Sequence, residues 1–124
     1  MRTLNYVLLA VRDPLASAEL YTRLLGREPV EKASTFVLYV LPTGLKIGLW
    51  LAADVVPKPL QAGGVELSFT EDSKDAVRAT YEEWMKLGLT ILQEPTEMDF
   101  GFTFVAQDPD GHRLRPFVPA ERPR

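Results

Sequence analysis

The sequence contains no cysteine and a single histidine, His112, in 124 residues. Without cysteine the chain can form no disulfide, no thiolate metal site and no thiol nucleophile. One histidine excludes a metal site that uses two or more histidines of one chain, and a Ser-His-Asp triad would have to use His112. The chemistry open to this protein is therefore narrower than its length suggests.

Long hydrophobic runs and an excess of positive charge are also missing. The longest apolar region, residues 36–56, is interrupted by a proline, a lysine and two glycines, so no membrane-spanning helix is predicted. The net charge is −3, and no basic stripe suited to a phosphate backbone is present, so we expect no nucleic-acid partner. The apolar run 6–11 is too short for a signal peptide and is followed by Arg12 and Asp13. We expect a cytoplasmic protein with no membrane partner.

What the chain does contain is the composition of one globular domain, with 46% hydrophobic and 25% charged residues. Residues 4–11 are rich in Val, Leu and Tyr and predict a strand buried on both faces. Asp13 and Pro14 can begin a helix that Gly26 ends. Strands are then predicted at 28–31, 36–41 and 45–51, the last two joined by the turn residues 42–44.

The same order of elements is then repeated after a connector. Residues 52–62 contain two prolines and no clear period. Residues 65–70 alternate between apolar and polar side chains, as a half-buried strand does. Asp72 and Ser73 can cap a helix that ends at Gly88. Strands follow at 90–93, 102–107 and 112–118, with the tight turn 108–111 between the last two and the acidic segment 94–99 as a solvated loop.

The chain is thus predicted to be an α+β protein of two βαβββ modules. Module one covers about 1–51, the connector about 52–62, module two about 63–119, and 120–124 form a polar tail. Each module would be a four-stranded sheet with one helix behind it. The two free sheet faces would then meet and enclose a space, all within a single domain.

This order, with the strand LNYVLLAVRD, the helix SAELYTRLLG and the closing hairpin FVAQDPDGHRLRPF, resembles the vicinal oxygen chelate superfamily over nearly the whole chain. That group contains glyoxalase I, extradiol dioxygenases, fosfomycin resistance enzymes and bleomycin-binding proteins. The resemblance implies the glyoxalase-like fold, in which the paired modules form a cupped mixed sheet around a pocket, usually in a homodimer. Its enzymes hold a divalent metal with His, Gln or Glu on the first and fourth strand of each module.

The four ligand positions that the resemblance implies fall on Tyr6, Gly48, Gly64 and Arg115. None is a usual ligand, and Arg115 is a permanent cation. Metal coordination needs deprotonated nitrogen or oxygen ligands. We therefore expect no metal and no other cofactor, and His112 alone would not replace the missing ligands.

Within the superfamily, the chain is most similar to antibiotic-resistance proteins of the phenazine-binding type. The residues that carry this similarity are 48–50 (GLW), Glu66 in VELSF, and 99–104 (DFGFTF) running into 108–112 (DPDGH). The resemblance implies that a flat aromatic antibiotic is sequestered in the cup.

Trp50 and Tyr6 are the ligand-binding candidates of module one. Trp50 has the strand parity of Gly48 and should face the cup, where an indole beside a glycine makes a slot for a planar ring. A core or interface tryptophan is the competing interpretation. Tyr6 could donate a hydrogen bond to the ligand, or it could be a buried tyrosine with a backbone partner.

Glu66 and Arg115 are the polar candidates of module two, on strands expected to be neighbours. Arg115 could bind an anionic or carbonyl group and Glu66 a ring N–H. A structural ion pair is the alternative. A carboxylate beside a cation is also a poor general base, which disfavours a catalytic role.

Three phenylalanines, Phe100, Phe102 and Phe104, share one face if their segment is extended. We expect Phe100 and Phe102 to line the pocket and Phe104 to lie in the core. Tyr39 is a weaker wall candidate. His112 is expected to have a structural role in its turn.

Together these residues predict a metal-free protein that sequesters a planar aromatic antibiotic such as a phenazine, with no catalytic residue. The first alternative is a metal-dependent enzyme of the glyoxalase or dioxygenase type. A second alternative is a partner-binding module, in which the chain itself fills the space around Trp50 and the phenylalanines.

Overall fold

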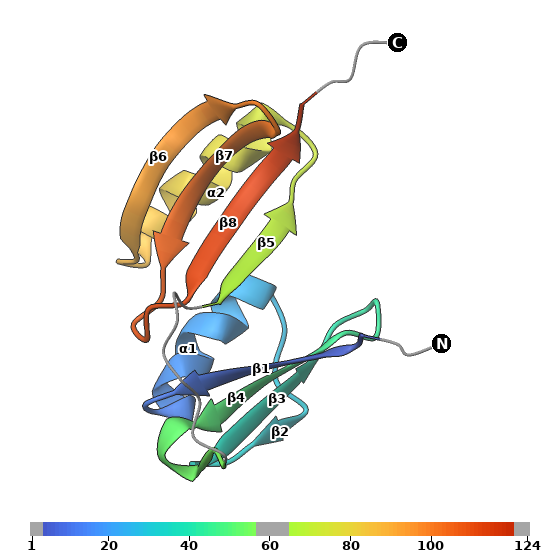
Figure 1. The fold of residues 1–124 in the computed structure, drawn as a ribbon, viewed down its shortest axis with the longest axis vertical. Helices are drawn as coiled ribbons and strands as arrows, with labels where there is room; N and C mark the ends of the chain where they lie inside the picture. The colour runs from blue at the N-terminus through green and yellow to red at the C-terminus, as the bar shows by residue number, and fades with distance from the viewer. Residues whose placement is uncertain (1–3, 57–64, 121–124) are drawn as a thin grey trace. The chain divides into compact units, whose positions relative to one another are not determined.

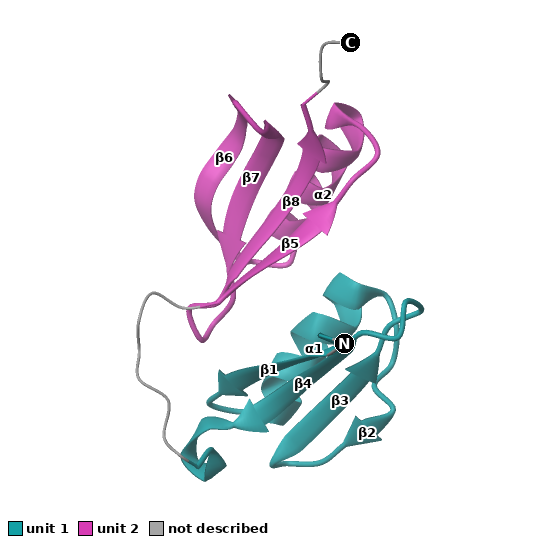
Figure 2. Ribbon diagram, turned by 45° about the vertical axis from the view of Figure 1, so that its right-hand side comes forward, with its two compact units in different colours: residues 1–61 teal, residues 62–124 magenta. Residues whose placement is uncertain are grey.

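The computed structural model describes residues 4–56 and 65–120. The chain divides into two compact units, unit 1 (residues 1–61) and unit 2 (residues 62–124). Each unit is a four-stranded mixed sheet with one helix packed on one face (Figures 1 and 2). This is the predicted α+β fold of two βαβββ modules. Within the described residues, no helix is long and apolar enough to cross a membrane.

Unit 1 has the sheet order β1-β4-β3-β2, in which β1 is parallel to β4 and the other pairs are antiparallel. A short 3-10 helix, η1, follows the last strand. The elements are β1 (Tyr6–Val11), α1 (Pro14–Leu25), β2 (Glu31–Lys32), β3 (Phe36–Val40), β4 (Lys46–Leu51) and η1 (Ala52–Asp54).

Helix α1 begins and ends where the sequence predicts. The Asp13 side chain accepts a hydrogen bond from the Ala16 backbone N–H at 3.2 Å, and Pro14 occupies the first turn. Gly26 has φ 68° and donates its N–H to the Thr22 carbonyl. The helix buries Ala18 and Tyr21 against the sheet, which contributes Leu9, Val37 and Leu49 to the same core.

The prediction that the first strand is buried on both faces is wrong. Leu9 and Val11 lie in the core with α1, but on the other face of β1 the side chains of Tyr6 and Leu8 are 37% and 47% exposed. One helix can cover only one face of the sheet. Leu8 is therefore exposed although it is apolar, and its side-chain type does not predict its burial.

Unit 2 has the corresponding order β5-β8-β7-β6, with β5 parallel to β8 and the remaining pairs antiparallel. Its elements are β5 (Glu66–Thr70), α2 (Lys74–Lys86), β6 (Thr90–Met98), β7 (Gly101–Gln107) and β8 (Arg113–Pro119).

Helix α2 packs on unit 2 through an aromatic cluster. Ser73 caps the helix by accepting from the Ala76 N–H at 3.0 Å. The Trp84 ring meets Phe69 and Phe104 edge to face, with centroids 5.7 and 5.5 Å apart. Phe104 is fully buried, as predicted for a core residue.

Two strand predictions are wrong in extent. Strand β6 continues through the acidic segment to Met98, although that segment was expected to be a loop. Register shifts between Ile91 and Gln93, and between Gln93 and Thr96, let the strand pass Pro95 while it still pairs with β7. Strand β2 is only Glu31–Lys32, because just these residues pair with β3.

The turn between β7 and β8 confirms its prediction. The Asp108 carboxylate accepts hydrogen bonds from the backbone N–H groups of Asp110 and His112, at 2.9 and 2.8 Å. Gly111 has φ 92°, a conformation that glycine adopts without strain.

Gly101, the first residue of β7, is expected to tolerate no side chain. Its φ is 151°, and an added Cβ would lie 2.1 Å from the Val118 backbone carbonyl. We expect Gly101→Ala to lower the free energy of unfolding by about 3 kcal/mol or more, since strain and a backbone clash combine. Gly88→Ala is the control, because Gly88 has φ 81° but open space around it. Gly88→Ala should lower the free energy of unfolding by about 1 kcal/mol in urea denaturation. Equal losses of stability for the two variants would contradict the predicted clash at Gly101.

Candidate functional site in unit 2

The two faces of the unit 2 sheet carry different side chains. Leu67, Phe104 and Leu114 point toward α2, and the residues that alternate with them point the other way. We call this second surface the open face of unit 2. Its members are mainly polar, and they are Glu66, Ser68, Thr103, Arg113, Arg115 and Phe117.

A hollow of about 340 Å³ lies on this open face. Its lining consists of Glu66, Ser68, Phe100, Arg115 and Phe117. The volume is at the lower end of the range for small-molecule sites. Strands β5 and β8 supply four of the lining residues, and the turn between β6 and β7 supplies Phe100. The hollow thus combines two aromatic rings with one pair of opposite charges.

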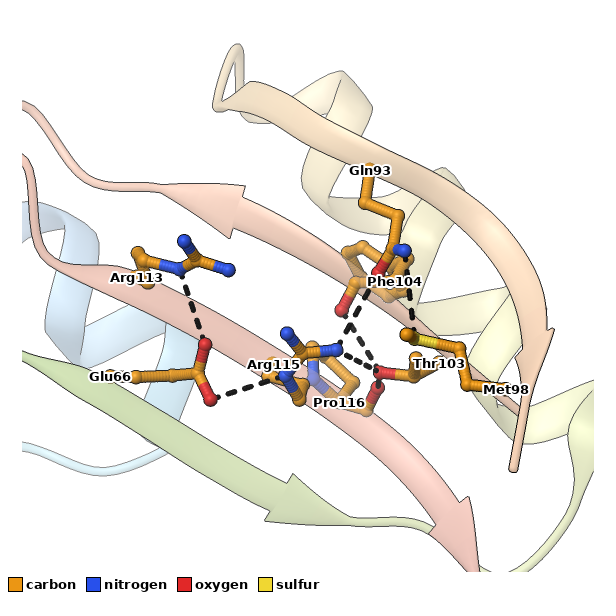
Figure 3. A network of polar contacts seen from close by, with 8 residues as sticks. All are labelled: Glu66, Gln93, Met98, Thr103, Phe104, Arg113, Arg115 and Pro116. Atoms are coloured by element: carbon orange, nitrogen blue, oxygen red, sulfur yellow. Dashed lines mark hydrogen bonds and ion pairs between the residues drawn. The ribbon is translucent and has the colours of Figure 1, made fainter. Parts of the chain in front are cut away.

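Glu66 lies between two arginines (Figure 3). One carboxylate oxygen, Oε1, is 3.2 Å from Nε of Arg113, and the other, Oε2, accepts from Nε of Arg115 at 3.1 Å. The parallel pairing of β5 with β8 places Glu66 opposite Arg113 and diagonal to Arg115. The prediction that Glu66 and Arg115 lie on neighbouring strands is confirmed.

The Arg115 guanidinium is supported from the other side as well. Its Nη1 lies 3.5 Å from Oε1 of Gln93 and 3.5 Å from the Thr103 hydroxyl (Figure 3). The Thr103 hydroxyl in turn donates to the Pro116 carbonyl at 2.8 Å. The Arg115 side chain is only 16% exposed. Its charge is therefore held in a fixed place on the wall of the hollow.

Phe100 provides the exposed aromatic surface of the hollow. It is 44% exposed, and its ring centroid is 6.2 Å from that of Phe117 in an edge-to-face arrangement. The Arg115 Cζ lies 5.5 Å from the Phe100 centroid, within cation–π range. Phe117 and Ser68 are not among the candidates predicted from the sequence. The two-residue period of a strand could have indicated them, because Phe117 lies two residues after Arg115 and Ser68 two residues after Glu66.

Phe102 does not line the hollow, contrary to expectation. It is 6% exposed and faces α2, where the Arg78 Cζ lies 4.8 Å and the Lys74 Nζ 5.9 Å from its ring centroid. Phe102 and Phe104 share the helix face of β7, as alternation requires. Phe100 precedes that strand, in the turn, and so does not follow its alternation.

Tyr39, the weaker wall candidate, is also on the helix side of its sheet. It is fully buried, and its hydroxyl donates to the Ala18 carbonyl at 3.1 Å and lies 3.0 Å from the Thr22 hydroxyl. Tyr39 alternates with Leu38 and Val40 in β3, so it faces α1. Its role is structural.

The slot expected beside Trp50 is filled by the chain itself. Trp50 and Gly48 share the face of β4 that is turned away from α1, with Phe36 paired opposite Trp50. A Cβ added to Gly48 would lie 2.7 Å from Cδ2 of Leu8 and 3.0 Å from the Phe36 ring. Leu8 and Phe36 therefore cover Gly48, and no planar slot is open at that position.

The residues at the metal positions implied by the resemblance do not suit a metal ion. Gly64 lies outside the described residues. Gly48 has no donor side chain, Arg115 is a cation bound to Glu66, and the Tyr6 ring has the Lys46 ammonium 5.9 Å from its centroid. Neutral or anionic donors are what a divalent metal needs. Within residues 4–56 and 65–120, no three His, Asp or Glu side chains come together as a metal site.

Comparison with known proteins identifies the family. The profile of the Glyoxalase/Bleomycin resistance protein/Dioxygenase superfamily matches residues 3–115. The chain belongs to this superfamily. It is similar to an Agrobacterium tumefaciens protein whose structure was determined in solution by NMR, with 43% identity over 98% of this chain and 100% of that chain and a TM-score of 0.90.

More distant members of the superfamily share the fold. A glyoxalase/bleomycin resistance protein/dioxygenase from Nocardioides has a TM-score of 0.83 at 22% identity, covering 100% of this chain and 87% of its own. A glyoxalase-related enzyme from Fulvimarina pelagi has the same TM-score, 0.83, at 21% identity, over 95% and 88% of the two chains. No curated protein sequence matches the chain.

Tyr39→Phe tests the structural role of Tyr39. Burial raises the pKa of the Tyr39 phenol above its usual 10.0, partly offset by the Thr22 hydrogen bond. The neutral phenol therefore stabilises the folded protein fully below about pH 10, and this contribution is lost as the pH rises through the higher folded pKa. We expect Tyr39→Phe to lower the free energy of unfolding by about 1 kcal/mol in urea denaturation at pH 7. Above pH 10 the difference in stability between the native protein and the variant should become smaller. Tyr6→Phe, at an exposed position, should leave the stability unchanged both at pH 7 and above pH 10. A stability difference between native protein and Tyr39→Phe that stayed constant to pH 11 would contradict this account.

Proposed function

We propose that this superfamily member binds a planar aromatic small molecule, with a phenazine antibiotic as the type, in the hollow of unit 2. The observation that carries the proposal is the composition of the hollow, in which the rings of Phe100 and Phe117 lie beside the guanidinium of Arg115. Ligand sites typically combine apolar and aromatic walls with a few fixed polar groups.

Each part of the lining has a role in this proposal. A flat ring would pack against the exposed surface of Phe100, while Arg115 and Glu66 would fix its polar substituents. Both carboxylate oxygens of Glu66 are bound to arginines, so the hollow offers fixed polar groups that can orient a ligand. Protection would come from sequestration, in which the compound is withheld from its target without a chemical step.

Trp50 is not assigned to the proposed site. Leu8 and Phe36 occupy the space over Gly48, so the primary contacts are assigned to unit 2. A homodimer in the cytoplasm remains the expected setting.

Calorimetric titration with a panel of phenazines and quinoxalines tests the proposal. We expect at least one compound to bind with micromolar affinity or better, because sequestration requires a Kd well below the toxic concentration. Phe100→Ala should weaken that binding about tenfold, through loss of ring contact and apolar burial. Met85→Ala is the matched control, since Met85 is an exposed apolar side chain of α2, and it should bind like the native protein.

Two results would oppose the proposal. If no compound of the panel bound, or if Phe100→Ala bound as tightly as Met85→Ala, the hollow would not be an aromatic site. Stoichiometric zinc, nickel, manganese or iron in the purified protein would instead favour the metal-dependent enzyme, and would show that the assigned ligand positions are wrong.

A further inference from the structure

We further propose that the ligand of the hollow carries a carboxylate, and that Arg115 is the residue that selects it. This inference rests on the proposed function, because it names the chemical class of the molecule held at the same site. It concerns which aromatic compounds bind, and it follows from the charges and hydrogen-bond geometry around Arg115.

The polar cluster around Glu66 carries a surplus of positive charge. Two guanidinium groups, those of Arg113 and Arg115, share the single carboxylate of Glu66, one at each oxygen. Glu66 is the only acidic residue that lines the hollow within the described part of the chain. The cluster therefore has a formal charge of +1, although residues 61–124 together carry −5. Arg113 does not line the hollow, so the surplus charge of the cluster lies beside it, and an anion bound at Arg115 would offset that charge.

The individual hydrogen-bond donors of Arg115 are not equally engaged. Its Nε donates to Glu66 at 3.1 Å, a normal hydrogen bond. Its Nη1 reaches Gln93 and Thr103 only at 3.5 Å, where hydrogen bonds are weak. Its Nη2 contacts no hydrogen-bond acceptor among the residues that the structure describes. The edge formed by Nη1 and Nη2 is therefore able to donate to both oxygens of a carboxylate, in the bidentate geometry that arginine favours.

Arg115 is already largely desolvated and fixed. Its side chain is 16% exposed, and Glu66, Gln93 and Thr103 surround the guanidinium. A charge-assisted hydrogen bond at such a site costs less side-chain entropy and is less weakened by water than one on the surface. The Phe100 ring lies 5.5 Å from Arg115 Cζ, so one molecule can meet both groups when its carboxylate is attached directly to its ring.

Glu66 has a definite part in this arrangement. It positions Arg115, but its negative charge also opposes the approach of an anionic ligand. Replacement of Glu66 with the neutral, equally shaped glutamine should therefore strengthen carboxylate binding. A pair with only a structural role predicts no such gain.

The test compares two probes that share one ring system, phenazine-1-carboxylate and the neutral phenazine-1-carboxamide. Kd values are measured by calorimetry for the native protein, Arg115→Gln, Glu66→Gln and Arg78→Gln. Arg78→Gln removes the same charge from α2, on the other face of the sheet. Thermal unfolding of each variant verifies that it is folded.

We expect the native protein and Arg78→Gln to bind the carboxylate at least about tenfold more tightly than the amide. In Arg115→Gln the two probes should bind about equally, and both more weakly than to the native protein, because Arg115 also contacts neutral polar substituents. In Glu66→Gln the carboxylate should bind several-fold more tightly than to the native protein, so its preference over the amide should increase.

Equal affinities of the native protein for the two probes would overturn this inference but leave the proposed function standing. Weaker carboxylate binding by folded Glu66→Gln would also overturn it. If neither probe nor any other compound of the panel bound, the proposed function itself would fail.

Discussion

In each unit a single helix packs against one face of a four-stranded sheet, and the other face has no helix. Because strand side chains alternate, this constraint assigns every residue of β1 to β8 to one of two environments. Phe104, Trp84 and Tyr39 lie on the helix sides and form the cores. Glu66 and Arg115 lie on the opposite side, where their charges remain accessible.

The sheet faces turned away from α1 and α2 differ in what they offer a ligand. In unit 1, Leu8 and Phe36 cover Gly48 and leave no open slot at that position. In unit 2, the charged side chains of Glu66 and Arg115 bind each other and line a hollow of about 340 Å³. This difference between two similar modules is why the proposed site belongs to unit 2.

Much of the fold is predictable from the sequence because its signals are local. Asp13, Ser73 and Gly26 define helix ends through contacts within a few residues. The proximity of Glu66 to Arg115 follows from the strand neighbours that the family resemblance implies, and the pairing of β5 with β8 confirms it. The failures involve non-local features, since the register shifts that carry β6 past Pro95 depend on pairing with β7.

The candidate site was predicted only in part, for a related reason. Parity identifies a face only if the strand boundary is known, and Phe100 and Phe102 fall on either side of such a boundary. The filling of the slot at Gly48 by Leu8 and Phe36 depends on side-chain packing between three strands. Sequence periodicity contains no information about that packing.

The central claim is that the open face of unit 2 is the ligand-binding surface. Amide and side-chain NMR shifts, mapped while a phenazine is titrated into the labelled protein, test it most directly. The account predicts shifts that saturate together at Ser68, Phe100, Arg115 and Phe117, with small changes on α2. Shifts centred on Gly48 and Trp50, with no change in unit 2, would contradict it.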